Sequence, residues 1–163
     1  MLYPEFFKAF ALRKDMQSAR LYICGLGIFE ATINGQKAGN DLLAPFINDY
    51  EEHYQYCTYD VTNLLKERNE ISVLLGDGWY RGHFGLGEPT HYDRPLALIA
   101  ELRIVYSDGS VETICTDESW QYRRSFTTLS DIYNGETQDH TRPLGDWQSA
   151  VVIGAPGKLC ERY

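Results

Sequence analysis

The chain has 163 residues, of which 44% are hydrophobic and 13% aromatic. This is enough apolar material for one folded domain that does not depend on disulfide bonds. Fifteen basic and 23 acidic residues give a net charge of −8, and an acidic surface repels the phosphates of nucleic acids. The composition therefore argues against a disordered chain and against a nucleic-acid partner, while neutral ligands such as sugars remain compatible with it.

The first apolar stretch, Phe6–Leu12, is interrupted by Lys8 and runs into charged residues from Arg13. This is not the pattern of a secretory signal, and no run in the chain is long enough to span a membrane. We therefore expect no membrane partner, and a cytoplasmic rather than a secreted location. The cysteines lack metal-ribbon spacing and are predicted to be small buried apolar residues, with a disulfide or a reactive thiol as the alternative: Cys24, Cys57, Cys115 and Cys160.

Apolar and polar residues alternate through 28–33, 70–75 and 96–105. Such alternation predicts strands with one buried face. Asn34-Gly35 follows the first of these segments and Asp108-Gly109 follows the last, and both pairs are typical of tight hairpin turns. Only residues 61–67 suggest a helical element, a single short turn capped by an aspartate or threonine.

The turns separate about eight or nine short strands along the chain. We therefore predict an all-β fold, an antiparallel β-sandwich with the jelly-roll topology of galactose-binding-like domains. Residues 1–153 are predicted to form this sandwich as an accessory domain. Residues 154–163, with glycines around Pro156, are predicted to be a linker or the start of a following domain.

Asn48 and Asp49 lie in the polar segment 46–53. Their side-chain oxygens are suitable ligands for a calcium ion. Alternatively, they accept hydrogen bonds from the neighbouring backbone in a turn. No cofactor is required by the sequence, and calcium is the one candidate.

The segment 76–85 surrounds Trp79, Tyr80 and Arg81 with glycines. An aromatic side chain on such a loop offers a flat face to a sugar ring, and an adjacent arginine can donate hydrogen bonds to its hydroxyls. Alternatively, the two aromatic side chains close one end of the sandwich while Arg81 pairs with an acid. We predict Trp79 as a sugar platform, Arg81 as a hydroxyl donor and Tyr80 as a further sugar contact.

Two more loops supply candidate sugar contacts. Asp93 lies in segment 90–95, where Pro95 stands at the entry to a predicted strand. Asp131 and Glu136 belong to the acid-rich segment 130–139. The alternative for that segment is a polar strand and turn at a domain interface, because no surrounding pattern indicates the deep cleft that an acid–base pair for glycoside cleavage requires.

Motifs of other enzyme classes are absent from the sequence. The four histidines have no zinc-site spacing, there is no GxSxG nucleophile motif, and no glycine-rich loop is followed by Lys and Ser or Thr. We therefore predict no catalytic residues within this chain.

Taken in order, the short motifs of the chain resemble the N-terminal β-sandwich domain of bacterial α-L-rhamnosidases. The resemblance covers about residues 5 to 150 and is most specific in Gly76–Gly82 and Asp131–Glu136. The other matching segments are Phe6–Phe10, Ala19–Ile23, Gly25–Gly27, Asn34-Gly35, Leu43–Pro45, Thr58–Thr62 and Asp93–Ala97.

The resemblance implies a part of an inverting glycoside hydrolase that removes terminal L-rhamnose. In that family the catalytic acid and base lie on a separate (α/α)6 barrel, C-terminal to this domain, so the expected partners are that barrel and other β domains of the same polypeptide. Some related sandwiches bind L-rhamnose through calcium, using an adjacent Asp-Asn pair. In this chain the nearest pair, Asn48-Asp49, has the opposite order.

Three functions follow from these observations. The first is a non-catalytic accessory domain that braces the barrel and contacts rhamnoside substrate. The second is a stand-alone lectin-like module for L-rhamnose or plant glycans, and the third is a purely structural sandwich. The isolated chain is expected not to hydrolyse an aryl α-L-rhamnoside.

Overall fold

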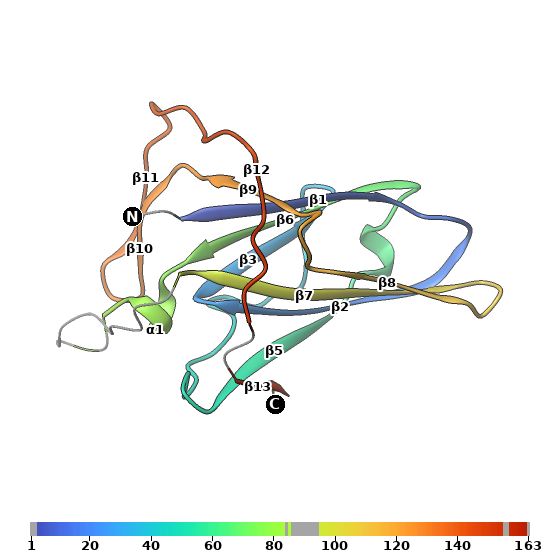
Figure 1. Ribbon diagram of the computed structural model, residues 1–163, viewed down its shortest axis with the longest axis horizontal. Helices are drawn as coiled ribbons and strands as arrows, with labels where there is room; N and C mark the ends of the chain where they lie inside the picture. The colour runs from blue at the N-terminus through green and yellow to red at the C-terminus, as the bar shows by residue number, and fades with distance from the viewer. Residues whose placement is uncertain (1–2, 84, 86–94, 155–156, 163) are drawn as a thin grey trace.

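Two β-sheets stack face to face in the computed structural model (Figure 1). The structure describes residues 3–83, 85, 95–154 and 157–162. The six-stranded sheet has the spatial order β12 (Gln148–Ser149), β9 (Gln121–Arg124), β1 (Pro4–Ala11), β6 (Arg68–Gly76), β3 (Ile28–Ile33) and β4 (Gln36–Lys37). The five-stranded sheet has the order β13 (Lys158–Glu161), β5 (His53–Asp60), β2 (Met16–Leu26), β7 (Ala97–Tyr106) and β8 (Val111–Cys115). A separate two-stranded ribbon consists of β10 (Thr127–Asp131) and β11 (Gly135–Gln138).

The side chains predicted to face inward form the core between the sheets. Ile71, Val73 and Leu75 of β6 are buried in one cluster with Leu102 and Ile104 of β7. Fully burying a side chain of this kind stabilises a fold by about 1.5–3 kcal/mol. This shared core holds the two sheets together, and the predicted all-β sandwich is confirmed.

Both predicted hairpins are present. Asn34 and Gly35 have φ values of 53° and 74° and join β3 to β4, as a tight turn with two left-handed residues requires. Between β7 and β8 only Gly109 has a positive φ, 82°, and Tyr106 donates its N–H to the carbonyl of Ser110. The second turn is therefore longer than the first, and its aspartate is not left-handed.

Two short helical elements complete the chain. The turn expected within 61–67 is the 3-10 helix η1 (Thr62–Leu64), and Asp60 Oδ1 accepts the N–H of Thr62 at its start. The glycine-rich segment 76–85, expected to be a loop, contains the one-turn helix α1 (Gly78–Arg81). Four residues are too few for a periodic pattern to be visible in sequence.

The C-terminal segment contributes to the sandwich itself. Residues 150–154, called the strap below, lead from β12 in one sheet to β13 in the other (Figure 1). β13 pairs with β5, and this pair is parallel, whereas the other pairs in the two sheets are antiparallel. That residues 154–163 link to or begin a following domain stays a prediction.

The cysteines differ from one another in environment. Cys24 and Cys57 are buried as predicted, and all four thiols are free. The prediction was wrong for Cys115, which is exposed at the end of β8, the last strand of the five-stranded sheet. Burial raises the pKa of the Cys24 thiol to about 12, so this thiol is unreactive at neutral pH. Within the described residues, no helix has the length and apolar character needed to cross a membrane.

Candidate functional site

Glycines at the end of β6 and directly after α1 allow α1 and β10 to approach each other. A Cβ at position 76 would lie 2.2 Å from Ser130 Oγ, and a Cβ at position 82 would lie 2.4 Å from the carbonyl oxygen of Gly78. Neither separation is sterically allowed, so the positions need Gly76 and Gly82. The glycine-rich motif therefore serves close packing between α1 and the ribbon.

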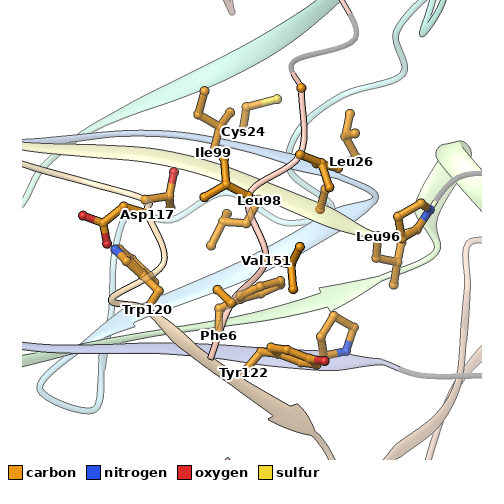
Figure 2. Close-up of a pocket in the computed structure, with 18 of the residues that line it drawn as sticks. Phe6, Cys24, Leu26, Leu96, Leu98, Ile99, Asp117, Trp120, Tyr122 and Val151 are labelled. Atoms are coloured by element: carbon orange, nitrogen blue, oxygen red, sulfur yellow. The ribbon is translucent and has the colours of Figure 1, made fainter. Parts of the chain in front are cut away.

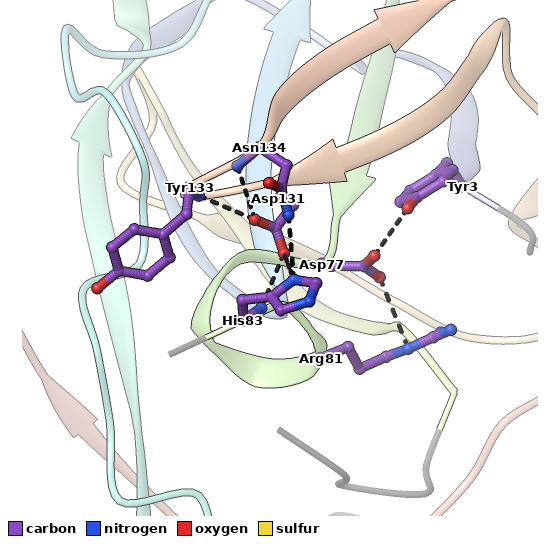
Figure 3. Close-up of polar contacts among 7 residues, drawn as sticks. All are labelled: Tyr3, Asp77, Arg81, His83, Asp131, Tyr133 and Asn134. Carbon is purple, nitrogen blue, oxygen red and sulfur yellow. Dashed lines mark hydrogen bonds and ion pairs between the residues drawn. The ribbon is translucent and has the colours of Figure 1, made fainter. Parts of the chain in front are cut away.

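The carboxylate of Asp131 fastens the segment after α1 to the turn of the ribbon (Figure 3). Its Oδ2 accepts the backbone N–H of His83 at 2.8 Å and lies 2.9 Å from the ring Nδ1 of the same residue. Its Oδ1 accepts the N–H groups of Tyr133 and Asn134, both at 2.9 Å. Burial alone would raise the pKa of Asp131, but these hydrogen bonds outweigh it and lower the pKa to about 2. Asp131 is thus an ionised structural residue, and its oxygens are occupied by the protein.

Asp77, at the start of α1, has a different environment (Figure 3). The hydroxyl of Tyr3 donates to its Oδ2 at 2.7 Å, and Arg81 Nε lies 3.6 Å from its Oδ1. Burial raises the pKa of Asp77 above its ordinary value, although Tyr3 and Arg81 both act to lower it. The alternative expectation that Arg81 pairs with an acid is therefore confirmed, and the pair leaves its side chain 20% exposed.

The two adjacent aromatic residues of α1 have different positions. Tyr80 is only 1% exposed and packs against Tyr50, with ring centroids 5.1 Å apart, so its ring closes the end of the core instead of facing solvent. Trp79 is partly buried and lies beside Phe46, at 5.6 Å between centroids and 34° between planes. Phe46 is 55% exposed. The exposed aromatic surface here is thus a Phe46–Trp79 pair.

Phe46 was not predicted as a site residue. Its signal in the sequence is an aromatic residue between Pro45 and Ile47, in an apolar run that begins at Leu42. Leu42 and Leu43 are also exposed in this loop. The pairing with Trp79 joins segments far apart in sequence, so no local pattern reveals it.

Asn48 and Asp49 use their side chains locally. Asn48 Nδ2 donates to the carbonyl of Phe46, its Oδ1 accepts the N–H of Gln55, and Asp49 Oδ1 accepts the N–H of Glu51. The alternative of a self-bonded turn is therefore confirmed. Among the residues that the structure describes, no three His, Cys, Asp or Glu side chains gather in a way that fits a metal ion. Calcium binding by Asn48 and Asp49 stays a prediction.

The remaining predicted residues do not join the aromatic pair. Glu136 is exposed on β11, where its Oε1 accepts a hydrogen bond from Gln138 at 2.7 Å. Asp93 lies outside the described residues. Two of the predicted residues are held by partners outside the predicted set. Arg81 lies beside Asp77, and Asp131 binds the segment after α1. Sugar contacts by these residues stay predictions.

An apolar groove of about 510 Å³ lies beneath the strap (Figure 2). Phe6 and Trp120 reach into it from the side of the six-stranded sheet, and Leu98 from the five-stranded sheet. The strap adds Val151, which is 78% exposed. The sequence analysis missed this groove, although three consecutive β-branched residues at 151–153 were a visible signal of it.

The family model described as the alpha-L-rhamnosidase N-terminal domain matches residues 14–154. A curated α-L-rhamnosidase of Streptomyces avermitilis is 36% identical over 137 residues, which are 83% of this chain and 13% of that enzyme. The crystal structure of Streptomyces avermitilis α-L-rhamnosidase complexed with L-rhamnose matches with a TM-score of 0.79 at 36% identity, over 85% of this chain and 14% of that one.

The α-L-rhamnosidase structure from Dictyoglumus thermophilum matches with a TM-score of 0.84 at 34% identity, over 99% of this chain and 19% of that one. The chain thus spans only between 13% and 16% of the length of the curated relatives that it matches.

Proposed function

Because this chain belongs to the alpha-L-rhamnosidase N-terminal domain family, we propose that it works as the non-catalytic accessory sandwich of an α-L-rhamnosidase. The observation that carries this proposal is the coverage of the match, which includes most of this chain but only a small part of each relative. The positions of the two predicted acids, Asp131 and Glu136, also support this proposal. Asp131 is committed to four contacts and Glu136 is exposed, so they do not form an opposed pair in an enclosed cleft.

The apolar groove supports a bracing role against the rest of the same polypeptide. Val151, Val152, Ile153 and Leu159 are exposed at or beside the groove. Contiguous exposed apolar side chains mark contact surfaces. We assign this face to contact with the catalytic barrel or with another β domain.

The Phe46–Trp79 pair supports a contact with rhamnoside. Aromatic faces pack against the C–H groups of a sugar ring. Arg81 would donate to sugar hydroxyls from its own side of α1, where it lies beside Asp77. The relative from Streptomyces avermitilis was solved with L-rhamnose. A single monosaccharide offers few atoms for contact, so we expect weak affinity.

Calorimetric titration of the chain with L-rhamnose tests the sugar contact. Phe46→Ala should weaken binding about five- to tenfold, since it removes one exposed stacking face. Trp147→Ala is the control, because Trp147 is also a partly exposed aromatic residue, 37%, but packs against Phe7 and Arg123 of the six-stranded sheet. No binding at high sugar concentration would leave only the structural role, and loss of binding on adding a chelator would support the calcium prediction.

An activity assay separates the accessory domain from a complete enzyme. The isolated chain should not hydrolyse an aryl α-L-rhamnoside. Turnover that survives purification and disappears in Glu136→Gln would contradict the proposal. A lectin-like module is favoured instead if the parent gene does not continue into a helical barrel and the chain binds rhamnose.

A further inference from the structure

The loop that carries Phe46, residues 41–47, has a backbone that needs outside support. Leu43 has a φ of 54°, in the left-handed region that a branched side chain rarely adopts. Such a conformation persists only when surrounding contacts fix it. One contact lies at the inner side of the loop, where Phe29 donates its N–H to the carbonyl of Ala44 at 2.7 Å.

The outer end of the loop is held through the carboxylate of Asp41. Its Oδ2 accepts the hydroxyl of Tyr59 on β5 at 2.9 Å, and Arg162 Nη1 lies 3.1 Å from the same oxygen. The Arg162 and Asp41 side chains are 29% and 35% exposed, so the ion pair is partly shielded from water. Hydrogen bonding to Cys57 and the charge of Asp41 raise the pKa of the Arg162 guanidinium, so it stays charged.

Arg162 reaches the loop because β13 joins the sheet at β5. The backbone N–H of Arg162 donates to the carbonyl of Tyr56 at 3.0 Å, directly after the paired residues of β13. Its guanidinium carbon then lies 6.0 Å from the centroid of the Phe46 ring, at the limit of a cation–π contact. One side chain thus contacts both the outer end of the loop and its exposed aromatic ring.

We propose that Arg162 is a positioning residue for the Phe46–Trp79 pair, and that β13 couples this pair to the C-terminal segment of the chain. The ion pair to Asp41 fixes the loop, and the planar guanidinium limits where the Phe46 ring can lie. Displacing β13 from β5 would release both contacts. The inference deepens the proposed sugar contact, since any sugar that stacks on Phe46 depends on the ring being held in place.

Hydrogen exchange of the amides in 41–47 tests the positioning role without any sugar. Arg162→Met keeps an unbranched apolar side chain but removes the charged guanidinium, and it should speed exchange in this loop about fivefold. Arg162→Lys keeps the charge without the planar group and should give a smaller increase. Arg142→Met is the control, because Arg142 pairs with Asp139 three residues away in an exposed position.

Asp41→Asn should reproduce the effect, and Asp41→Asn combined with Arg162→Met should add little to either single change, because both remove the same ion pair. Unchanged exchange in Arg162→Met, or an equal effect from Arg142→Met, would overturn the inference. Rhamnose titration then separates the two proposals. If the wild-type chain does not bind L-rhamnose but its loop still depends on Arg162, the sugar contact fails and the positioning role stands.

Discussion

The α1 turn and the strap differ in the kinds of side chain that they expose to solvent. Around α1, the charged groups find partners within the protein, as Asp131 and Asp77 illustrate. Along the strap, Val151 and its two neighbours expose apolar side chains above a groove. A charged group that is fully hydrogen-bonded within the protein, as Asp131 is, stabilises the domain by itself, whereas an exposed apolar region gains free energy only when something covers it.

The largest expected effect is at Asp131. Asp131→Ala removes the acceptor of three backbone N–H groups and of the His83 ring, and leaves those donors without their charged partner. We expect a loss of about 3 kcal/mol in the free energy of unfolding, measured by urea denaturation. Glu136→Ala, on an exposed strand, should change it by less than about 0.5 kcal/mol. Equal effects would mean that the α1 turn is not held by this carboxylate.

Close packing at α1 should give the next largest effect. Gly82→Ala places a Cβ 2.4 Å from the Gly78 carbonyl and 2.8 Å from Asp131 Oδ2, so the backbone must shift. The expected cost is about 2 kcal/mol, measured as a lower unfolding midpoint. Gly154→Ala in the strap is the matched control, since no heavy atom of the described residues lies within 4 Å of the added Cβ. A neutral Gly82→Ala would show that the approach of α1 to the ribbon is not tight.

Lowering the pH should change the contributions of Asp131 and Asp77 to the stability of the fold in opposite directions. The folded-state pKa of Asp131 is lowered to about 2 from 3.8, so its stabilisation is complete above about pH 4 and is lost as the pH falls toward 2. The expected loss is about 2 kcal/mol. Asp77 has a raised pKa, so protonation favours the folded state and its contribution has the opposite sign.

Unfolding free energies measured between pH 6 and pH 2 check this expectation. Asp131→Ala should have a shallower loss of stability in acid than the wild type. An unchanged slope would assign the acid sensitivity to other carboxylates.

The smallest effect on stability is expected at the strap. Replacing Val151, Val152 and Ile153 singly by serine should change the unfolding free energy by less than about 0.5 kcal/mol each, because the side chains are already exposed. The same changes should reduce binding of an apolar dye, and any self-association of the chain seen by light scattering. A large loss of stability would mean that the strap belongs to the core and is not a contact face.

Local patterns in the sequence were sufficient to predict the sandwich and its hairpins. The reason is that apolar alternation and left-handed turn residues act over only a few positions. Phe29, Ala31 and Ile33 face the core as predicted, and Asn34-Gly35 turns the chain. The candidate site was harder to predict from the sequence. Trp79 and Arg81 lie in the predicted segment, but Tyr80 is buried by Tyr50, and Phe46 comes from another loop. Such pairings depend on which loops meet in space.

The sequence by itself determined the all-β fold class, the strands of the core, the hairpin turns and the family, since these depend on periodicity and on short motifs in a fixed order. Only the tertiary structure decided that Asp131 is a structural anchor, that Phe46 joins Trp79 and that β13 returns to pair with β5. The physical reason is that burial and hydrogen bonding between distant segments, not the identity of a residue, determine whether its side chain is available to a ligand.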